Sequence, residues 1–222
     1  MNGRVLRERI IAYGQRAIHK QIACPLAVCP CCGGRPVRFG RHGVRKRLFR
    51  VFAQEVIEEV GSYLTRWKCP LCRRTFTQYP WWAIPFKRYV LPFIEERCEA
   101  YVEDRARTYA AGVRTDEGLP FSHADAEAGR ELAASTLWHW HTTLGGMSEA
   151  VRAALELIKQ KDPSTGVFRE LGQLVIRAAK YRSAARKKVL HQCGERLVVA
   201  RAYRALFGTA AFPVFATAFA FR

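Results

Sequence analysis

Two short cysteine motifs, Cys29-Pro30-Cys31-Cys32-Gly33-Gly34 and Cys69-Pro70-Leu71-Cys72-Arg73-Arg74, decide how this chain should fold. In each motif two residues separate a pair of cysteines, and a proline follows the first cysteine. This spacing lets one tight turn direct both thiolates at a single point, and two such turns supply four ligands for a tetrahedral ion. We therefore predict one structural Zn²⁺ ion, bound by Cys29, Cys32, Cys69 and Cys72. Four thiolates would leave no open coordination position for catalysis.

The chain contains eight cysteines, and the other four are weaker candidates for metal binding. Cys24 and Cys31 lie close enough to act as substitute ligands, but Cys31 is offset by one residue and should point its sulfur away. Cys98 falls in a helical pattern and Cys193 in a basic segment. We expect both to be small buried or half-buried side chains.

The thirty-six residues from Gly33 to Lys68 are too many for a simple loop between the motifs. Glycines at 40, 43 and 61 indicate turns between short apolar segments. The predicted strands are Pro36–Phe39, Arg47–Phe52, Glu55–Val60 and Ser62–Trp67. Together with the cysteine motifs they predict a zinc ribbon, a small antiparallel sheet in which the metal replaces part of a core.

The charge of the chain indicates a polyanionic partner. Thirty-seven Lys and Arg residues against nineteen Asp and Glu give a formal net charge of +18, far more than solubility requires. Three runs contain no acidic residue: 9–54, 60–94 and 171–194. A single basic run is usually a solvated face, but three of them in one chain favour nucleic acid.

Basic side chains near the cysteine motifs are the candidates for phosphate contacts, which would set the affinity for nucleic acid and its dependence on salt. They are Arg35, Arg38, Arg41, Arg45, Lys46, Arg47, Arg50, Arg73, Arg74, Lys87 and Arg88.

The ribbon is followed by an aromatic stretch, 79–89, that two prolines interrupt. We expect an irregular connector there, with stacking of Trp81 or Trp82 on bases as an alternative. Apolar residues then recur at helical spacing from Tyr89 to Val113, which predicts one long amphipathic helix.

A helix-turn-helix is predicted next. Ser122 and Ser135 are suitable caps for two helices, and Gly145-Gly146 would end the second, Thr136–Leu144. Leu137, Trp140, His141 and Leu144 share the face expected in the core. The base-contacting candidates on the other face are Ser135, Thr136, His139 and Thr143. A plain helical hairpin is the alternative. His139 and His141 are two residues apart and point in nearly opposite directions, so they should not form a metal pair.

The carboxy-terminal region should be helical over Ser148–Lys161 and Phe168–Phe207, with a break at 162–166. The apolar segment Gly208–Phe221 is too short to span a membrane and predicts a packing tail or an oligomer contact. The first twenty residues lack the apolar core of a signal peptide. We therefore expect a cytoplasmic, nucleoid-associated protein.

These elements predict an α+β fold in which a small antiparallel zinc ribbon is followed by a mainly α-helical region. The predicted divisions are a basic amino-terminal helix (1–23), the zinc ribbon (24–80), a helical region with the helix-turn-helix (81–146) and a basic helical region (147–222).

Several of these motifs resemble the amino-terminal regions of bacterial insertion-sequence transposases and related zinc-ribbon proteins. The similar segments are the two cysteine motifs, the second continuing into Thr75-Phe76-Thr77, together with Pro85-Phe86-Lys87-Arg88-Tyr89 and Ser135-Thr136-Leu137-Trp138-His139-Trp140. They cover roughly residues 24–146. Such transposases carry a carboxylate triad on a further ribonuclease H-like sheet, whereas the acidic residues after Gly146 lie in helical patterns.

The resemblance and the charge together predict a DNA-binding protein without nuclease activity, a targeting or regulatory component of transposition. Its expected partners are double-stranded DNA, a separate recombinase subunit and a second copy of itself, with no membrane. Two alternatives stay open. One is an RNA-binding zinc-ribbon protein, and the other is a divergent transposase or nuclease.

Overall fold

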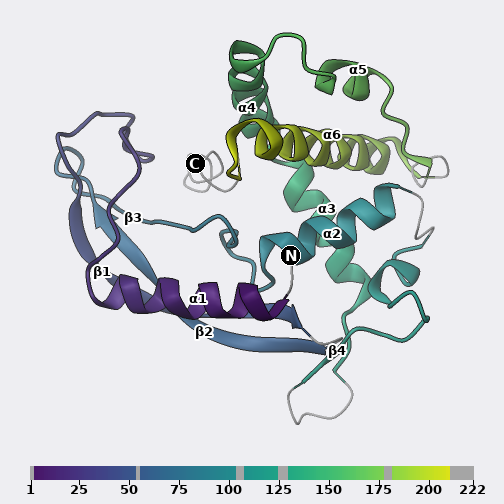
Figure 1. Cartoon of the computed structure of the whole chain (residues 1–222), viewed down its shortest axis with the longest axis horizontal. Helices are drawn as coiled ribbons and strands as arrows, with labels where there is room; N and C mark the ends of the chain where they lie inside the picture. The colour runs from purple at the N-terminus through teal and green to yellow at the C-terminus, as the bar shows by residue number, and fades with distance from the viewer. Residues whose placement is uncertain (1–2, 54–55, 104–107, 125–129, 178–181, 211–222) are drawn as a thin grey trace.

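A long β-hairpin and a group of helices make up the chain, which we describe from a computed structural model covering residues 3–53, 56–103, 108–124, 130–177 and 182–210 (Figure 1). This part of the chain is an α+β structure with a four-stranded, mainly antiparallel sheet and six α-helices. The helices are α1 (Gly3–Ile18), α2 (Leu91–Val102), α3 (Ala134–Gly145), α4 (Ser148–Lys161), α5 (Val167–Gly172) and α6 (Ala184–Phe207), with a 3₁₀ turn at Ala111–Val113. The strands are β1 (Gly40–Ala53), β2 (Val56–Lys68), β3 (Thr75–Thr77) and β4 (Ser122–His123).

The structure has two long strands, β1 and β2, in the segment where turns at the glycines predicted four short strands. β1 pairs with β2 in antiparallel register from Gly40↔Lys68 to Ala53↔Val56, and β1 begins after the predicted strand Pro36–Phe39. Gly61 lies inside β2 opposite Leu48, and Gly43 lies beside the irregularity in β1. These glycines were misread as turns because a glycine can occupy a strand wherever neighbouring strands satisfy its backbone.

Helix α1 lies along the hairpin (Figure 1). Its buried residues are Leu6, Ile10, Gly14 and Ala17, at helical spacing. The Ser62 hydroxyl donates a hydrogen bond to the Ile10 carbonyl at 2.8 Å. A Cβ added at Gly14 would lie 2.8 Å from the Ser62 Oγ, so the absence of a side chain there sets the close approach of α1 to β2.

Helix α2 is shorter than the predicted helix from Tyr89 to Val113. Tyr89 instead forms a bridge with Arg50 of β1, and α2 begins at Leu91 and ends at Val102. Tyr109 extended the apolar pattern beyond that end, but it packs from a turn, with its ring 4.6 Å from that of Tyr101. The apolar pattern therefore continues past Val102 because Tyr109 is packed against α2, and not because the chain is helical at that residue.

The predicted helix start at Ser122 is wrong. Ser122 and His123 form β4, which pairs in parallel with Val56 and Ile57 of β2. The exposed edge of β2 offers backbone partners to this segment, and tertiary pairing outweighs a capping residue. Residues 125–129 of the predicted first helix lie outside the described residues.

The second predicted helix is confirmed as α3. It begins one residue before Ser135, after Ala133, which makes no side-chain capping bond. Leu137, Trp140, His141 and Leu144 are buried as predicted.

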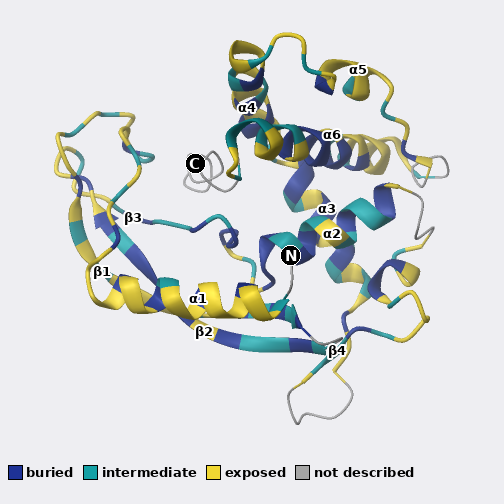
Figure 2. Ribbon diagram, viewed as in Figure 1, coloured by how far each residue is buried: buried dark blue, intermediate teal, exposed yellow. Residues whose placement is uncertain are grey.

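The carboxy-terminal region follows the prediction only in part: the predicted helix Phe168–Phe207 is divided, because α5 ends at Gly172, a poor helix former, and α6 begins at Ala184. α4 has the predicted bounds, and 162–166 separates it from α5 and α6. One hydrophobic core contains residues from the hairpin and from every helix α1 to α6 (Figure 2). Within the described residues, no helix is both long and apolar enough to cross a membrane. Most of the apolar segment Gly208–Phe221 lies outside them, at 211–222.

Candidate metal centre and basic surface

The four cysteines of the two motifs converge at the open end of the hairpin. Their sulfur atoms all lie within 4.8 Å of one another, and the Sγ atoms of Cys29 and Cys72 are 3.9 Å apart. Sulfurs bound tetrahedrally to zinc at about 2.3 Å would be about 3.8 Å apart. The donor set and its spacing therefore fit a structural metal ion.

The two motifs have the same backbone geometry. Cys29 N–H donates to the Gly34 carbonyl at 2.8 Å and Gly33 N–H to the Cys29 carbonyl at 2.9 Å. In the second motif, Cys69 and Arg73 make the equivalent bonds at 3.0 and 2.9 Å. Gly33 and Arg73, at corresponding positions, have φ values of 70° and 58°. The same left-handed turn thus presents each pair of sulfurs.

The turn also prepares sulfur for ionisation. Burial opposes the thiolate of Cys29, but the backbone N–H groups of Cys31 and Cys32 stabilise it, and its pKa falls to about 7. The Cys31 N–H lies 3.4 Å from the Cys29 Sγ. Cys24 and Cys31 are outside the group of four sulfurs, as predicted for Cys31.

A small separate core supports the cysteine end. It contains Cys29, Phe39, Trp67, Cys69 and Phe76, with the two phenylalanine rings edge to face at 5.1 Å. Because so few side chains give little stability by themselves, metal binding would contribute much of the order at this end.

The basic candidates separate into exposed and internally bonded groups. Arg41 donates to the Ala17 carbonyl. Arg47 donates to the Tyr79 hydroxyl and the Lys87 carbonyl, and its guanidinium lies over the Phe49 ring. These contacts give both side chains a structural role within the fold.

Arg50 also belongs to the internally bonded group. It pairs with Glu59 at 3.0 Å, its side chain is 11% exposed, and it lies over the Tyr89 ring. Lys87 is half-buried, and burial lowers its pKa. The exposed members of the predicted set are Arg35, Arg38, Arg45, Lys46, Arg73, Arg74 and Arg88.

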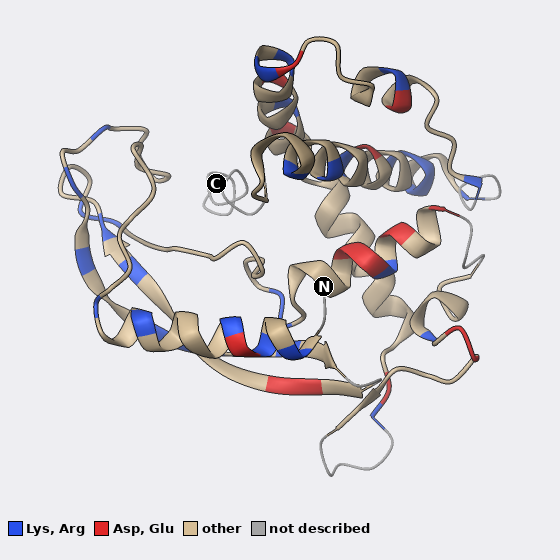
Figure 3. Cartoon of the chain, in the orientation of Figure 1, with Lys and Arg blue, Asp and Glu red and all other residues tan. Residues whose placement is uncertain are grey.

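The hairpin brings the first two acid-free runs of the sequence together. β1 and β2 pair antiparallel, so Arg45 and Lys46 lie opposite Leu64 and Tyr63 rather than opposite acidic residues. Glu58 and Glu59 lie near the other end of β2, where they pair with Arg7 and Arg50. Figure 3 shows this separation, with blue at the cysteine end and red near β4.

On α3, Ser135 and His139 are exposed, whereas Thr136 and Thr143 are half-buried. The Thr143 hydroxyl donates to the His139 carbonyl at 2.7 Å, which leaves its oxygen as an acceptor. Next to this face, Arg186 of α6 lies over the Trp138 ring.

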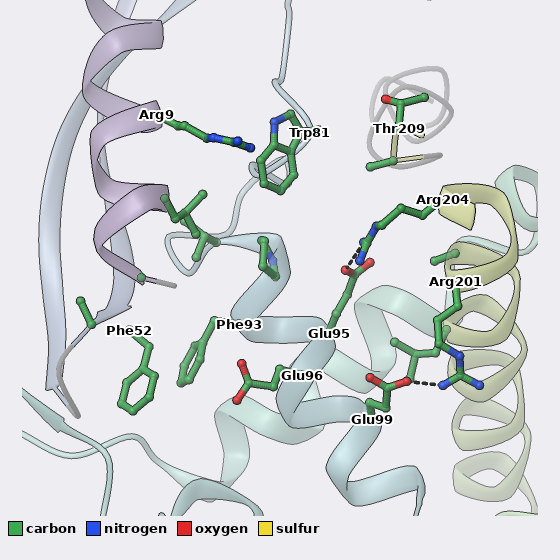
Figure 4. Close-up of a pocket in the computed structure, with 18 of the residues that line it drawn as sticks. Arg9, Phe52, Trp81, Phe93, Glu95, Glu96, Glu99, Arg201, Arg204 and Thr209 are labelled. Atoms are coloured by element: carbon green, nitrogen blue, oxygen red, sulfur yellow. Dashed lines mark hydrogen bonds and ion pairs between the residues drawn. The ribbon is translucent and has the colours of Figure 1, made fainter. Parts of the chain in front are cut away.

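A cavity of about 760 Å³ lies between α1, α2 and α6 (Figure 4). Glu95 and Glu99 of α2 line it, and their carboxylates pair with Arg204 and Arg201 of α6. Arg201 also pairs with Glu170. The carboxylates are therefore committed to ion pairs that join helices.

A second group of potential ligands lies in the helical core: Cys98, His141 and Cys193. Burial lowers the pKa of His141 to about 4, although the Leu137 and Cys98 carbonyls favour the charged ring, so this histidine is neutral in the core. The sequence predicted His141 in the core and both cysteines as buried or half-buried, but no spacing in the sequence indicates that the three residues meet.

Trp82, a candidate for base stacking, is 1% exposed and packs edge to face on Phe49 and Tyr13. Trp81 is half-buried and lines the cavity.

Comparison with protein-family models, curated proteins and solved structures finds no significant match to this chain.

Proposed function

We propose that this protein is a zinc-containing DNA-binding protein that targets or regulates a transposition reaction without cutting DNA itself. Zinc would be held by Cys29, Cys32, Cys69 and Cys72 and would fix the end of the hairpin as a platform. The observation that carries the proposal is the antiparallel pairing of two acid-free runs next to the cysteine group. This pairing leaves the cations on the platform without acidic neighbours.

The exposed platform cations support binding to phosphate. Arg35, Arg38, Arg45, Lys46, Arg73 and Arg74 are exposed, and in the described part of the chain none of them makes an ion pair. Concentrated like charge destabilises a folded protein by self-repulsion, and a polyanion offsets that repulsion. Phosphate contacts of this kind supply affinity and orient the protein, but they do not select a sequence.

A second surface is proposed to read bases. Ser135 and His139 on α3 are exposed, as are Arg186, Lys187 and Lys188 near the start of α6, and Arg186 lies over the ring of Trp138, the residue before His139. Cations in the first turn of a helix oppose its dipole, at a cost of roughly 0.3–1 kcal/mol each at the surface. Binding of phosphate there would offset this cost.

The resemblance to transposase amino-terminal regions suggests the ends of a mobile element as the target. Duplex DNA is favoured over single-stranded RNA because neither candidate for base stacking is free: Trp82 is enclosed in the core and Trp81 is half-buried. The ion pairs of Glu95 and Glu99 support a non-cutting role, since catalytic metal ions need carboxylates free to bind them.

The salt dependence of binding tests the proposal. We compare Arg38→Gln/Arg45→Gln/Lys46→Gln on the platform with Arg152→Gln/Lys159→Gln/Lys161→Gln on α4, whose three cations are also exposed. Both variants lose the same charge. Fluorescence anisotropy with a mixed-sequence duplex between about 50 and about 200 mM salt should give a slope of log K against log salt that is lower by about 2.7 for the platform variant only.

Equal slopes in the two variants would show that DNA does not use the platform. A single-stranded RNA competitor of equal length distinguishes the alternative. If that RNA displaces the duplex at equimolar concentration, the protein is an RNA-binding protein instead.

A further inference from the structure

Three potential metal ligands from three different helices meet in the helical core. Cys98 comes from α2, His141 from α3 and Cys193 from α6, and each is 0% exposed. The two sulfur atoms and an imidazole nitrogen all lie within 4.8 Å of one another. The group belongs to the helical half, away from the cysteine end of the hairpin (Figure 1).

Close approach of two helix backbones places His141 beside Cys193. A Cβ added at Gly145 would lie 2.7 Å from the Val189 carbonyl oxygen and 3.5 Å from the Cys193 nitrogen. Only glycine permits this contact between α3 and α6 without a shift of one helix. His141 lies one turn before Gly145, so the same crossing brings its ring to α6.

The histidine ring is oriented for binding a cation. Its Nδ1 lies 2.8 Å from the Leu137 carbonyl oxygen, which fixes the proton on Nδ1 and leaves the lone pair on Nε2. The Nε2 atom is buried and makes no hydrogen bond of ordinary geometry, although the Cys98 carbonyl is close enough to the ring to favour its charged form. Leaving such an atom unsatisfied in the core is unfavourable, and a bound cation would satisfy it. A backbone carbonyl that accepts from the distal ring nitrogen is the usual outer partner of a metal-binding histidine.

We propose that Cys98, His141 and Cys193 bind a second zinc ion, which joins α2, α3 and α6. Two thiolates and a neutral imidazole balance the double charge of Zn²⁺, as a site closed to solvent requires. A water molecule would complete the four ligands. A disulfide between the two cysteines would remove both thiolate ligands. It would also leave the lone pair of His141 Nε2 without a partner.

The number of zinc ions per chain tests this site. The whole chain is purified with reductant, reconstituted with Zn²⁺ alone, and measured by native mass spectrometry and elemental analysis. We expect two ions in the unmodified protein and one in Cys193→Ala and in His141→Phe. Cys24→Ala removes a cysteine that lies outside both groups, so it is the matched control and should keep two.

Ligand counting gives a second measurement that needs no variant. X-ray absorption at the zinc edge of the unmodified protein should give an average of about three sulfur ligands per zinc with a nitrogen contribution, against about four if only the hairpin site is filled. Loss of folding in a variant therefore cannot hide the answer.

The outcomes also separate this site from the zinc site of the proposed function. If the protein binds one ion and Cys193→Ala loses it while Cys69→Ser keeps it, the core site stands and the hairpin site fails. If the single ion depends on Cys69, or if Cys193→Ala still binds two, the core site is refuted.

Discussion

Arg73 occupies a backbone conformation that glycine adopts at the matching position of the first motif, and its replacement gives a prediction that separates stability from DNA binding. Its φ is 58°, against 70° for Gly33. A residue with a Cβ pays about 1–2 kcal/mol in this left-handed region. Glycine avoids that cost, but its greater flexibility in the unfolded chain lowers the free energy of unfolding by roughly 0.5–1 kcal/mol. Arg73→Gly should therefore be more stable than Arg73→Ala by about 0.5–1 kcal/mol.

The difference should appear as zinc affinity, because the turn at Arg73 presents Cys69 and Cys72. Competition with a chromophoric chelator should show about two- to fivefold tighter zinc binding for Arg73→Gly than for Arg73→Ala. Both variants lose the same charge, so both should lower the salt slope of DNA binding by about 0.9.

Arg74→Gly is the matched control. Arg74 is the next residue, is also exposed and does not have a positive φ, so the substitution should not tighten zinc binding. If Arg73→Gly binds zinc no more tightly than Arg73→Ala, or if Arg74→Gly shows the same gain, the equivalence of the two turns is wrong.

Two further predictions concern the hairpin and its helix. Cys69→Ser should remove the hairpin zinc and change the near-ultraviolet circular dichroism of Trp67, which packs with Cys69. The far-ultraviolet helical signal should persist, because α2 to α6 belong to the main core. Full zinc content and an unchanged melting curve would refute the cysteine group. Gly14→Ala should destabilise the protein by about 1–3 kcal/mol in urea unfolding, since the new Cβ meets the Ser62 Oγ at 2.8 Å, whereas exposed Gln15→Ala should have little effect. Equal stability of these two variants would contradict the close packing of α1 on β2.

The parts of the fold that local sequence determines were predicted well. Two cysteines separated by two residues specify a turn by themselves, and the four sulfurs indeed come together. α4 also has the predicted bounds, because its apolar residues and the following Asp162-Pro163 segment set both ends. Each turn and the helix are specified by neighbouring residues, whereas the meeting of the two turns depends on the pairing of β1 with β2.

The errors arose where distant partners decide the structure. Gly61 is surrounded by paired strand residues, and the Leu48 partner that keeps it in β2 lies thirteen positions away. Ser122 has the side chain of a helix cap, but the edge of β2 near Val56 draws it into a strand. A local preference worth about 1 kcal/mol is easily overcome by such pairing.

The core group shows the same limit in the candidate sites. The spacing of the two histidines of α3 argues against an ion shared between them, and it carries no information about partners on other helices. The partners of His141 instead lie on α2 and α6, and Cys98 and Cys193 are joined to it only by the packing of three helices. Burial of His141 and Cys98 follows from helical periodicity, and burial of Cys193 from its small apolar side chain, but the convergence of the three depends on the helix crossings.

The shared core has a consequence for how the two proposed DNA surfaces would act. Phe52 of β1 stacks on Phe93 of α2 at 5.3 Å, and Phe93 meets Trp140 of α3 at 5.8 Å. Trp140 is buried next to exposed His139, so this aromatic series fixes the outer face of α3 relative to the hairpin. Buried aromatic contacts resist sliding because close-packed cores do not deform continuously. The turn end of the hairpin and α3 would therefore keep a fixed relation. With the cysteine end ordered by its metal, specificity would depend on the spacing between the platform and α3 as well as on the side chains of either surface.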